Sequence, residues 1–171
     1  LEGIEPLVRT YLGGLPATGR VEAWRDVGVE PPRGIIEKKV YRGVEPQSQS
    51  VIAFSGPFDY DGWRNNFELA AMAQVLQIKL REVLREDLGG TYGVGVSASG
   101  SQYPREDYSI RIRFGSDPER AEELNQVIFA QIDSLKPVDV EQNYIDKVIQ
   151  MNKRQREVQL KENGFWSGSL Q

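Results

Sequence analysis

Residues 91–114, TYGVGVSASGSQYPREDYSIRIRF, alternate twice between apolar residues and small or polar ones. The apolar positions are every second residue, first Tyr92, Val94, Val96 and Ala98, then Tyr108, Ile110, Ile112 and Phe114. Because successive side chains of a strand point to opposite faces, each run predicts a strand with one buried face. Gly100 to Arg105 is predicted to be the hairpin connection between the two strands.

Helical periodicity flanks this hairpin. Residues 64–86 predict a long helix with one apolar stripe: Leu69, Met72, Leu76, Leu80 and Val83. Asp117-Pro118-Glu119 predicts the start of a second helix, because aspartate caps helices and proline is favoured at the first helical position. Its stripe is Ala121, Leu124, Ile128, Ile132 and Leu135. A last helix is predicted from Asp139 to Lys161, with an apolar stripe of Tyr144, Val148 and Met151 and an interruption at Gly164-Phe165-Trp166.

Two further strands are predicted before the long helix. Ile35–Tyr41 and Ser50–Phe54 are rich in β-branched and aromatic residues and are separated by turn residues, so we expect antiparallel neighbours. A short helix from Ile4 to Leu12 precedes them, and Pro16 to Pro32 is predicted to be an irregular connection that wraps the domain. This order of elements indicates an α+β two-layer sandwich, with helices covering one face of an antiparallel sheet.

Composition narrows the possible functions. The chain has 171 residues, of which 39% are apolar and 27% are charged, and this length and composition predict one globular domain over residues 1–171. A net charge of -4 argues against a general nucleic-acid binder, and no run approaches the ~20 apolar residues that a membrane span needs. The absence of cysteine excludes a disulfide framework and a thiolate metal site. The opening residues resemble neither a signal peptide nor a natural start, so we expect a fragment of a longer chain.

Several motifs are rejected as sites. Gly93-x-Gly95-x-x-Ala98 has loose dinucleotide spacing but lies inside a predicted strand, where small residues facing a covering helix explain it better. Asp59-x-Asp61-Gly62 resembles the start of a calcium loop, but its closing glutamate is missing, so helix capping is predicted. The serines lack a neighbouring imidazole base because the chain contains no histidine. The basic stretch between Lys147 and Lys161 is interleaved with acidic residues, which indicates a solvated helix face.

One corner of the chain remains as a candidate site. Arg85 ends the long predicted helix and Tyr92 starts the first strand of the hairpin, on either side of Gly89-Gly90. A guanidinium and a phenol at this edge can both donate hydrogen bonds to a peptide carbonyl or a developing oxyanion. The structural alternative is a cation favoured in the last helical turn and a tyrosine that packs beneath the helix.

The same corner resembles a known motif. Leu84-Arg85-Glu86-x-x-Gly89-x-x-Tyr92-x-Val94 resembles the Arg/Tyr motif of the pitrilysin (insulinase-like) zinc metallopeptidases. Tyr11-Leu12-Gly13-Gly14-Leu15-Pro16 and Gly115-Ser116-Asp117-Pro118-Glu119 resemble a helix end and a strand-to-helix step of the same family. Together the matches cover most of the chain.

The resemblance implies a metal-free domain. The family's catalytic domain holds zinc through an inverted H-x-x-E-H motif, and a chain without histidine cannot hold zinc in that way. The chain therefore resembles a C-terminal domain, the last of four in one long chain or, alternatively, the second domain of a shorter oligomeric member. No cofactor is expected here, and zinc is expected in the partner domain of the full-length protein.

The resemblance also implies roles and partners. Arg85 and Tyr92 would contact the substrate backbone beside the scissile bond and stabilise the tetrahedral intermediate, while no residue of this fragment is catalytic alone. The implied partners are the zinc-bearing N-terminal domain of the same protein and a peptide substrate. A periplasmic or cell-envelope location is a guess from the family.

Two other functions stay open for this chain, and the resemblance also gives an expectation about the edge of the sheet. The chain could be a non-catalytic structural or assembly module of the same fold, or a stand-alone peptide-binding domain. The family's domain begins with a strand that is not visible here, so we expect an unpaired sheet edge, which invites a dimer of the fragment.

Overall fold

The computed structural model describes residues 3–17, 19–23, 25–87, 93–136 and 140–169, and of residues 85–87 it describes the backbone alone. The chain divides into two units, Leu1–Glu30 and Pro31–Gln171. In the first unit the predicted short helix is confirmed as α1 (Glu5–Tyr11), and its side chains are exposed. The described residues between Pro16 and Pro32 form neither helix nor strand, so the connection is irregular, as predicted, and its wrapping of the domain stays a prediction.

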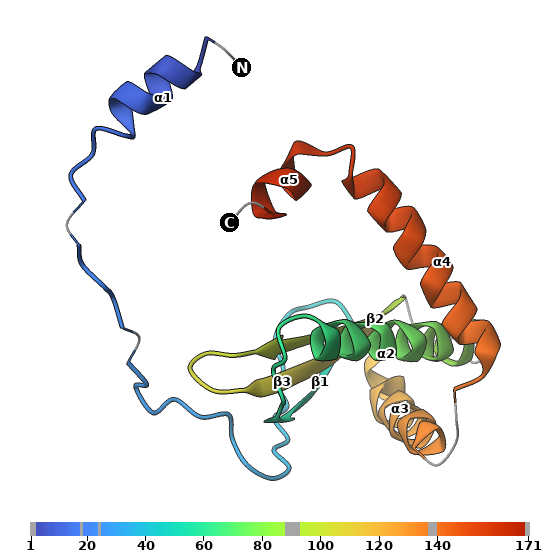
Figure 1. Ribbon diagram of the computed structural model, residues 1–171. Helices are drawn as coiled ribbons and strands as arrows, with labels where there is room; N and C mark the ends of the chain where they lie inside the picture. Colours follow the sequence, from blue (N-terminus) through green and yellow to red (C-terminus); the bar gives the residue numbers. More distant parts are fainter. Residues whose placement is uncertain (1–2, 18, 24, 88–92, 137–139, 170–171) are drawn as a thin grey trace. The chain divides into compact units, whose positions relative to one another are not determined.

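The second unit contains an antiparallel sheet of three strands, β1 (Ser48–Pro57), β2 (Gly93–Ser101) and β3 (Asp107–Ser116) (Figure 1). The strand order is β1-β3-β2, so β3 is central. β2 and β3 pair from Gly93 opposite Gly115 to Ser101 opposite Asp107, which confirms the predicted hairpin over its described residues. The predicted strand at residues 50–54 is also confirmed and extends further, since β1 pairs with β3 along its whole length.

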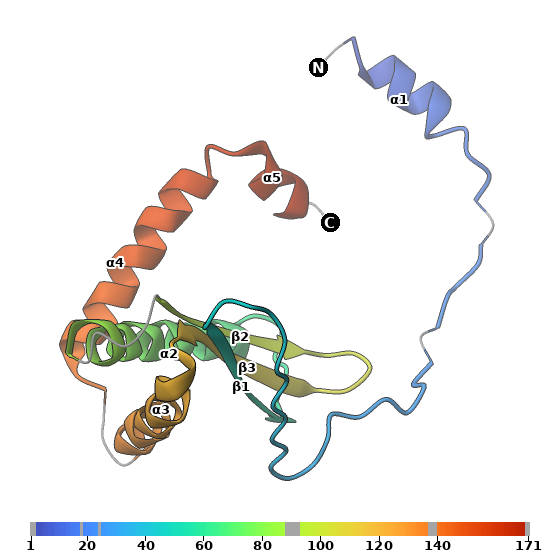
Figure 2. The ribbon, with the colours of Figure 1, turned by 180° about the vertical axis from the view of Figure 1, so that it is seen from behind.

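Helices follow the strands in the predicted order. They are α2 (Arg64–Arg81), the π-helical segment η1 (Glu82–Asp87), the 3₁₀ turn η2 (Pro118–Arg120), α3 (Ala121–Leu135), α4 (Gln142–Gln159) and α5 (Asn163–Ser169). The view from behind shows α2 and α3 against the sheet, and the start of α4 lies beside the end of α2 (Figure 2). The sequence predicts that Gly164, Phe165 and Trp166 interrupt the last helix, but in the structure they form part of α5. The Trp166 indole nitrogen donates a hydrogen bond to the Leu160 carbonyl.

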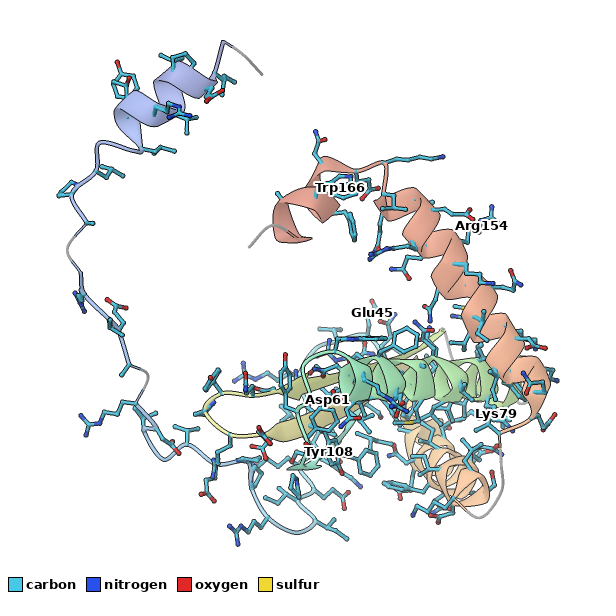
Figure 3. All side chains as sticks on the ribbon, viewed as in Figure 1. Glu45, Asp61, Lys79, Tyr108, Arg154 and Trp166 are labelled. Carbon is cyan, nitrogen blue, oxygen red and sulfur yellow. The ribbon has the colours of Figure 1, made fainter. Side chains whose placement is uncertain are left out.

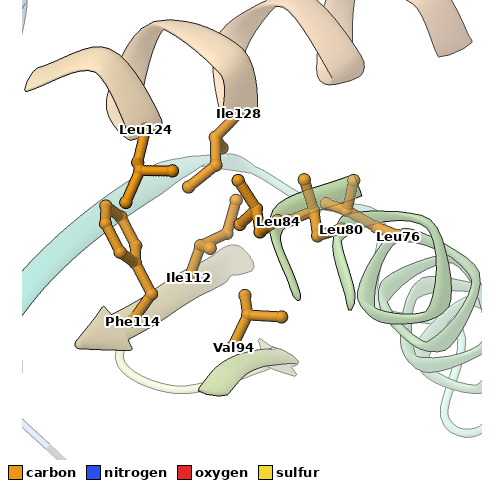
Figure 4. Close-up of a cluster of buried hydrophobic side chains, with 8 residues drawn as sticks. All are labelled: Leu76, Leu80, Leu84, Val94, Ile112, Phe114, Leu124 and Ile128. Carbon is orange, nitrogen blue, oxygen red and sulfur yellow. The ribbon is translucent and has the colours of Figure 1, made fainter. Parts of the chain in front are cut away.

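One apolar core joins α2, α3 and the sheet (Figure 4). Its buried side chains are Leu76, Leu80, Leu84, Val94, Ile112, Phe114, Leu124 and Ile128. Each fully buried side chain of this size contributes about 1.5–3 kcal/mol relative to an exposed one. Because both helices cover the same face of an antiparallel sheet, the predicted α+β class is confirmed.

The stripe of α2 agrees with the prediction at its centre and differs at both ends. Leu76 and Leu80 are buried, as predicted. Met72 is 42% exposed and Val83 is half-buried, whereas their neighbours Ala73 and Leu84 are buried. The prediction of one buried face is therefore right, and its membership at the two ends is wrong.

The predicted strand at Ile35–Tyr41 is wrong. The structure shows no strand there, and Ile35, Val40 and Tyr41 are exposed. β-propensity measures how a side chain fits a half-buried pleated surface, and this segment has no such neighbour. β1 is therefore an edge strand within the described residues, its described strand partner being β3.

The glycines of β2 also correct the sequence interpretation. Gly93 and Gly95 do not face a covering helix: they are exposed, and a Cβ atom at either would meet nothing within 4 Å. Gly100 is the close-packed one, because a Cβ atom there would collide with the Phe58 ring and the Asn66 side chain. Asn66 also accepts a hydrogen bond from the Gly100 N–H at 2.9 Å, which ties the hairpin tip to the start of α2.

Candidate functional site

The two predicted site residues, Arg85 and Tyr92, lie on either side of the corner between η1 and β2, and the structure describes the segments before and after this corner. Arg85 lies in η1, and its side chain is outside the described part of the chain. Tyr92 immediately precedes β2 and lies outside the described residues. The predicted convergence of the guanidinium and the phenol therefore stays a prediction.

Both approaches to this corner are anchored in the same core. Leu84, just before Arg85, is fully buried, and Val94, two residues after Tyr92, is 9% exposed. The two side chains belong to one apolar cluster (Figure 4). The end of the helix and the start of the strand are thus fixed relative to one another, which is what a site built across the corner requires.

The backbone that carries Arg85 is unusual. The sequence predicts a continuous α-helix to Glu86, but Glu82–Asp87 is π-helical. Such segments are rare and are found frequently at functional sites, because the wider turn re-aims the side chains that follow it. No periodicity in the sequence indicates this segment.

A polar cluster holds the start of η1 to α4. The Tyr144 hydroxyl donates to the Glu82 carboxylate at 2.7 Å, and Lys147 Nζ donates to its other oxygen at 3.2 Å. The Tyr144 ring lies below two ammonium groups, Lys79 at 4.6 Å and Lys147 at 4.9 Å from the ring centroid. Lys79 also lies 3.6 Å from Glu141, at the place where α2 meets α4 (Figure 3). These five residues are named the Glu82 cluster.

The cluster shifts the titration of its two central groups. The hydrogen bond from Tyr144, together with the charges of Lys147 and Lys79, lowers the pKa of Glu82 below its usual value of 4.5 against the opposing effect of desolvation. The same hydrogen bond, with burial and the Glu82 charge, raises the pKa of Tyr144 to about 12. At neutral pH the pair is therefore a carboxylate that accepts from a protonated phenol.

α4 has few other attachments. Val148 is the one buried residue of this helix. Gln74 Nε2 donates to Asn152 Oδ1 at 3.0 Å, and an open groove between α2 and α4 is lined by Ile78, Asn143, Asp146, Lys147, Gln150 and Met151. The sequence analysis missed this arrangement, since it placed Tyr144 in an apolar stripe and Lys147 on a solvated face. A phenol and a lysine three residues apart on one helix are the signal that could have indicated a carboxylate partner.

The described residues do not fit a metal ion. None of the described histidine, cysteine, aspartate or glutamate side chains forms a group of three or more that could hold one, and the sequence contains no histidine or cysteine. Asp61 accepts a hydrogen bond from the Asn65 N–H at 2.8 Å, so Asp59-x-Asp61-Gly62 caps the start of α2, as predicted.

Among the helices that the structure describes, none has the length and apolar character to cross a membrane.

Comparison with known proteins decides the family. The sequence model of the peptidase M16 inactive domain matches residues 1–152. The chain belongs to the peptidase M16 family. This match confirms the pitrilysin-like resemblance, and the chain is an inactive domain of a metallopeptidase family. No curated protein matches the sequence.

Two solved structures share the M16 fold of this chain. The periplasmic protease PqqL from Escherichia coli matches with a TM-score of 0.60 and 20% identity over 72% of this chain. A mutant of the ferredoxin protease FusC, in complex with Arabidopsis ferredoxin, matches with a TM-score of 0.55 and 21% identity over 71%. The matched region is 14% of the PqqL chain and 13% of the FusC chain, so this chain corresponds to a small part of each protease.

Proposed function

We propose that this chain is the metal-free C-terminal domain of a zinc-dependent endopeptidase, and that it encloses peptide substrate and supplies Arg85 and Tyr92 to the active site of the zinc-bearing N-terminal domain. The observation that carries the proposal is the anchored corner. A π-helical turn bearing Arg85 leads out of the core at Leu84, and the chain returns to the same core at Val94.

The chemistry of the pair supports the proposal. A guanidinium carries five N–H donors and a phenol one O–H donor, and both can hydrogen-bond the carbonyl oxygens of a bound peptide. Donors preorganised around a developing oxyanion supply large rate enhancements, because they need no reorganisation during the reaction. This chain then binds and orients the substrate, and the metal chemistry belongs to the partner domain.

The test is kinetic and uses the full-length protein. Arg85→Ala and Tyr92→Phe should each lower kcat/KM by about 10²–10³-fold, the usual cost of removing one oxyanion donor, with zinc content unchanged. Arg81→Ala is the matched control, because Arg81 is an exposed arginine one turn earlier on the same helix. Normal turnover in both Arg85→Ala and Tyr92→Phe would refute the assignment.

A second candidate function is a structural or assembly module without proteolysis. It is favoured by the description of the matching domain as inactive. Arg85 would then be a helix-end charge and Tyr92 a packing residue. An H-x-x-E-H motif elsewhere in the full-length sequence supports the enzyme, and its absence supports the module.

We also propose a periplasmic or cell-envelope location. Its support is that the similar PqqL is a periplasmic protease. Fractionation of cells that express the full-length protein tests this, since recovery in the cytosolic fraction would contradict it.

A further inference from the structure

The sheet has a second face, opposite the one on which α2 and α3 pack. Side chains alternate along each strand, so the residues that do not point toward α2 and α3 form this outer face. They are Gln49, Val51, Ala53, Ser55 and Pro57 of β1, Gly93, Gly95, Ser97, Ser99 and Ser101 of β2, and Asp107, Ser109, Arg111, Arg113 and Gly115 of β3. Most of them are glycine, serine or alanine, so few large side chains stand on this face.

Two arginines stand in the middle of this face. Arg111 and Arg113 are exposed on the central strand. In the strand register Arg111 lies between Ala53 and Ser97, and Arg113 lies between Val51 and Gly95. Small neighbours on both sides leave the two guanidinium groups accessible along their length.

The outer face is cationic in a chain whose net charge is negative. The chain carries -4 overall, yet Asp107 is the single acidic residue among the outward positions, and it lies at the far end beside Arg105, at 4.0 Å. Among the outward strand positions, the neighbours of Arg111 are Ala53 and Ser97 and those of Arg113 are Val51 and Gly95, and none of these carries a carboxylate. Weakly hydrated guanidinium groups in such a setting bind carboxylates well, because their planar forks match the two oxygens.

The spacing of the arginines selects the shape of the ligand. Side chains two residues apart on a strand are separated by roughly 6.6 Å, since each residue advances the strand by about 3.3 Å. An extended peptide has the same repeat, so carboxylates at alternate positions of such a peptide fall at the same interval. Carboxylates at adjacent positions point to opposite sides and cannot both reach the face.

We propose that the outer face of this sheet binds an extended peptide segment that carries carboxylate side chains at alternate positions, which pair with Arg111 and Arg113. This surface is independent of Arg85 and Tyr92, so it does not rest on the proposed proteolytic role. A single-stranded nucleic acid is disfavoured as the occupant because the outward positions of the three strands include no aromatic side chain on which bases could stack.

The test measures binding of labelled peptides to the 171-residue chain by fluorescence anisotropy at low ionic strength. Two isomeric β-prone peptides are compared, one with glutamates at positions i and i+2 and one with glutamates at i and i+1. The alternate isomer makes one more exposed ion pair than the adjacent isomer, which predicts a preference of roughly 1.4- to 5-fold for the alternate isomer, and added salt should remove it. Equal binding of the two isomers, or equally tight binding of an oligonucleotide of the same length, would overturn the proposal.

Substitutions on the outer face test whether the peptide binds at Arg111 and Arg113. The double variant Arg111→Gln/Arg113→Gln should abolish the preference, whereas Arg154→Gln, the same change at an exposed position of α4, should leave it intact. Gly95→Glu adds a carboxylate opposite Arg113 at a position with open space, and it should weaken binding while Gly95→Gln does not. Circular dichroism confirms that each variant is folded. Unchanged binding by Gly95→Glu or by the double variant would place the peptide elsewhere and refute the proposal.

Discussion

α3 and α4 are attached to the rest of the domain by different kinds of contact. α3 buries Leu124 and Ile128 in the core, and Phe129 packs edge-on against Phe54 of β1 with ring centroids 6.2 Å apart. α4 buries Val148 alone and is otherwise held by the Glu82 cluster and by Gln74 with Asn152. Apolar packing is insensitive to salt and pH, whereas charged hydrogen bonds respond to both. We therefore expect α3 to unfold with the core and α4 to be able to detach on its own.

The largest expected effect is on α3. Ile128→Ala removes a fully buried side chain and should lower the free energy of unfolding by about 2–5 kcal/mol, measured by denaturant unfolding. Gln126→Ala, an exposed position on the same helix, should change it by less than about 0.5 kcal/mol. If the two variants unfold alike, α3 is not part of the core.

A smaller and local effect is expected on α4. Tyr144→Phe removes the hydroxyl that donates to Glu82 and should cost about 1 kcal/mol, since the partner is charged but Glu82 is 36% exposed. Amide hydrogen exchange should rise in α4 and stay unchanged in α3. Tyr108→Phe makes the same chemical change on β3 and serves as the control. Faster exchange in both helices would contradict independent detachment.

The smallest effect is the dependence on pH. Because the pKa of Glu82 is lowered in the folded state, its contribution to stability is present above its ordinary pKa of 4.5 and is lost as the pH falls through the lower folded value. The raised pKa of Tyr144, about 12, gives a contribution that is complete below its ordinary pKa of 10.0 and is lost as the pH rises through 12. Thermal unfolding of the wild type and Glu82→Gln should therefore differ most near neutral pH and converge in acid. A difference that persists in acid would show that the carboxylate charge is not what holds α4.

Local periodicity accounts for what the sequence predicts well. The alternation from Val94 to Ala98 and from Tyr108 to Phe114 places the buried face of the hairpin correctly, because that pattern depends on the strand itself. The helical stripe through Leu124 and Ile128 is right for the same reason. These regions carry enough apolar residues at one period to specify their own orientation.

The features that the sequence does not predict depend on contacts between residues that are far apart in the chain. Ile35–Tyr41 has the composition of a strand, but whether it pairs depends on a neighbouring edge, and here it is exposed. The link from Glu82 to Tyr144 joins residues 62 positions apart, so no local pattern shows it. The π-helical segment that contains Arg85 is likewise not indicated by any periodicity of the local sequence. The roles of Arg85 and Tyr92, the dimer and the single domain over residues 1–171 stay predictions.

The three glycines of β2 have a consequence for how this strand can evolve. Gly93 and Gly95 border open solvent and have room for larger side chains, so natural variation at these positions can change the chemistry of the surface without disturbing the fold. Gly100 has no such freedom, since even a methyl group would push apart the Phe58 ring and Asn66. We therefore expect two variable positions and one constrained position in the same strand, and a survey of substitutions tolerated in a growing population should separate them.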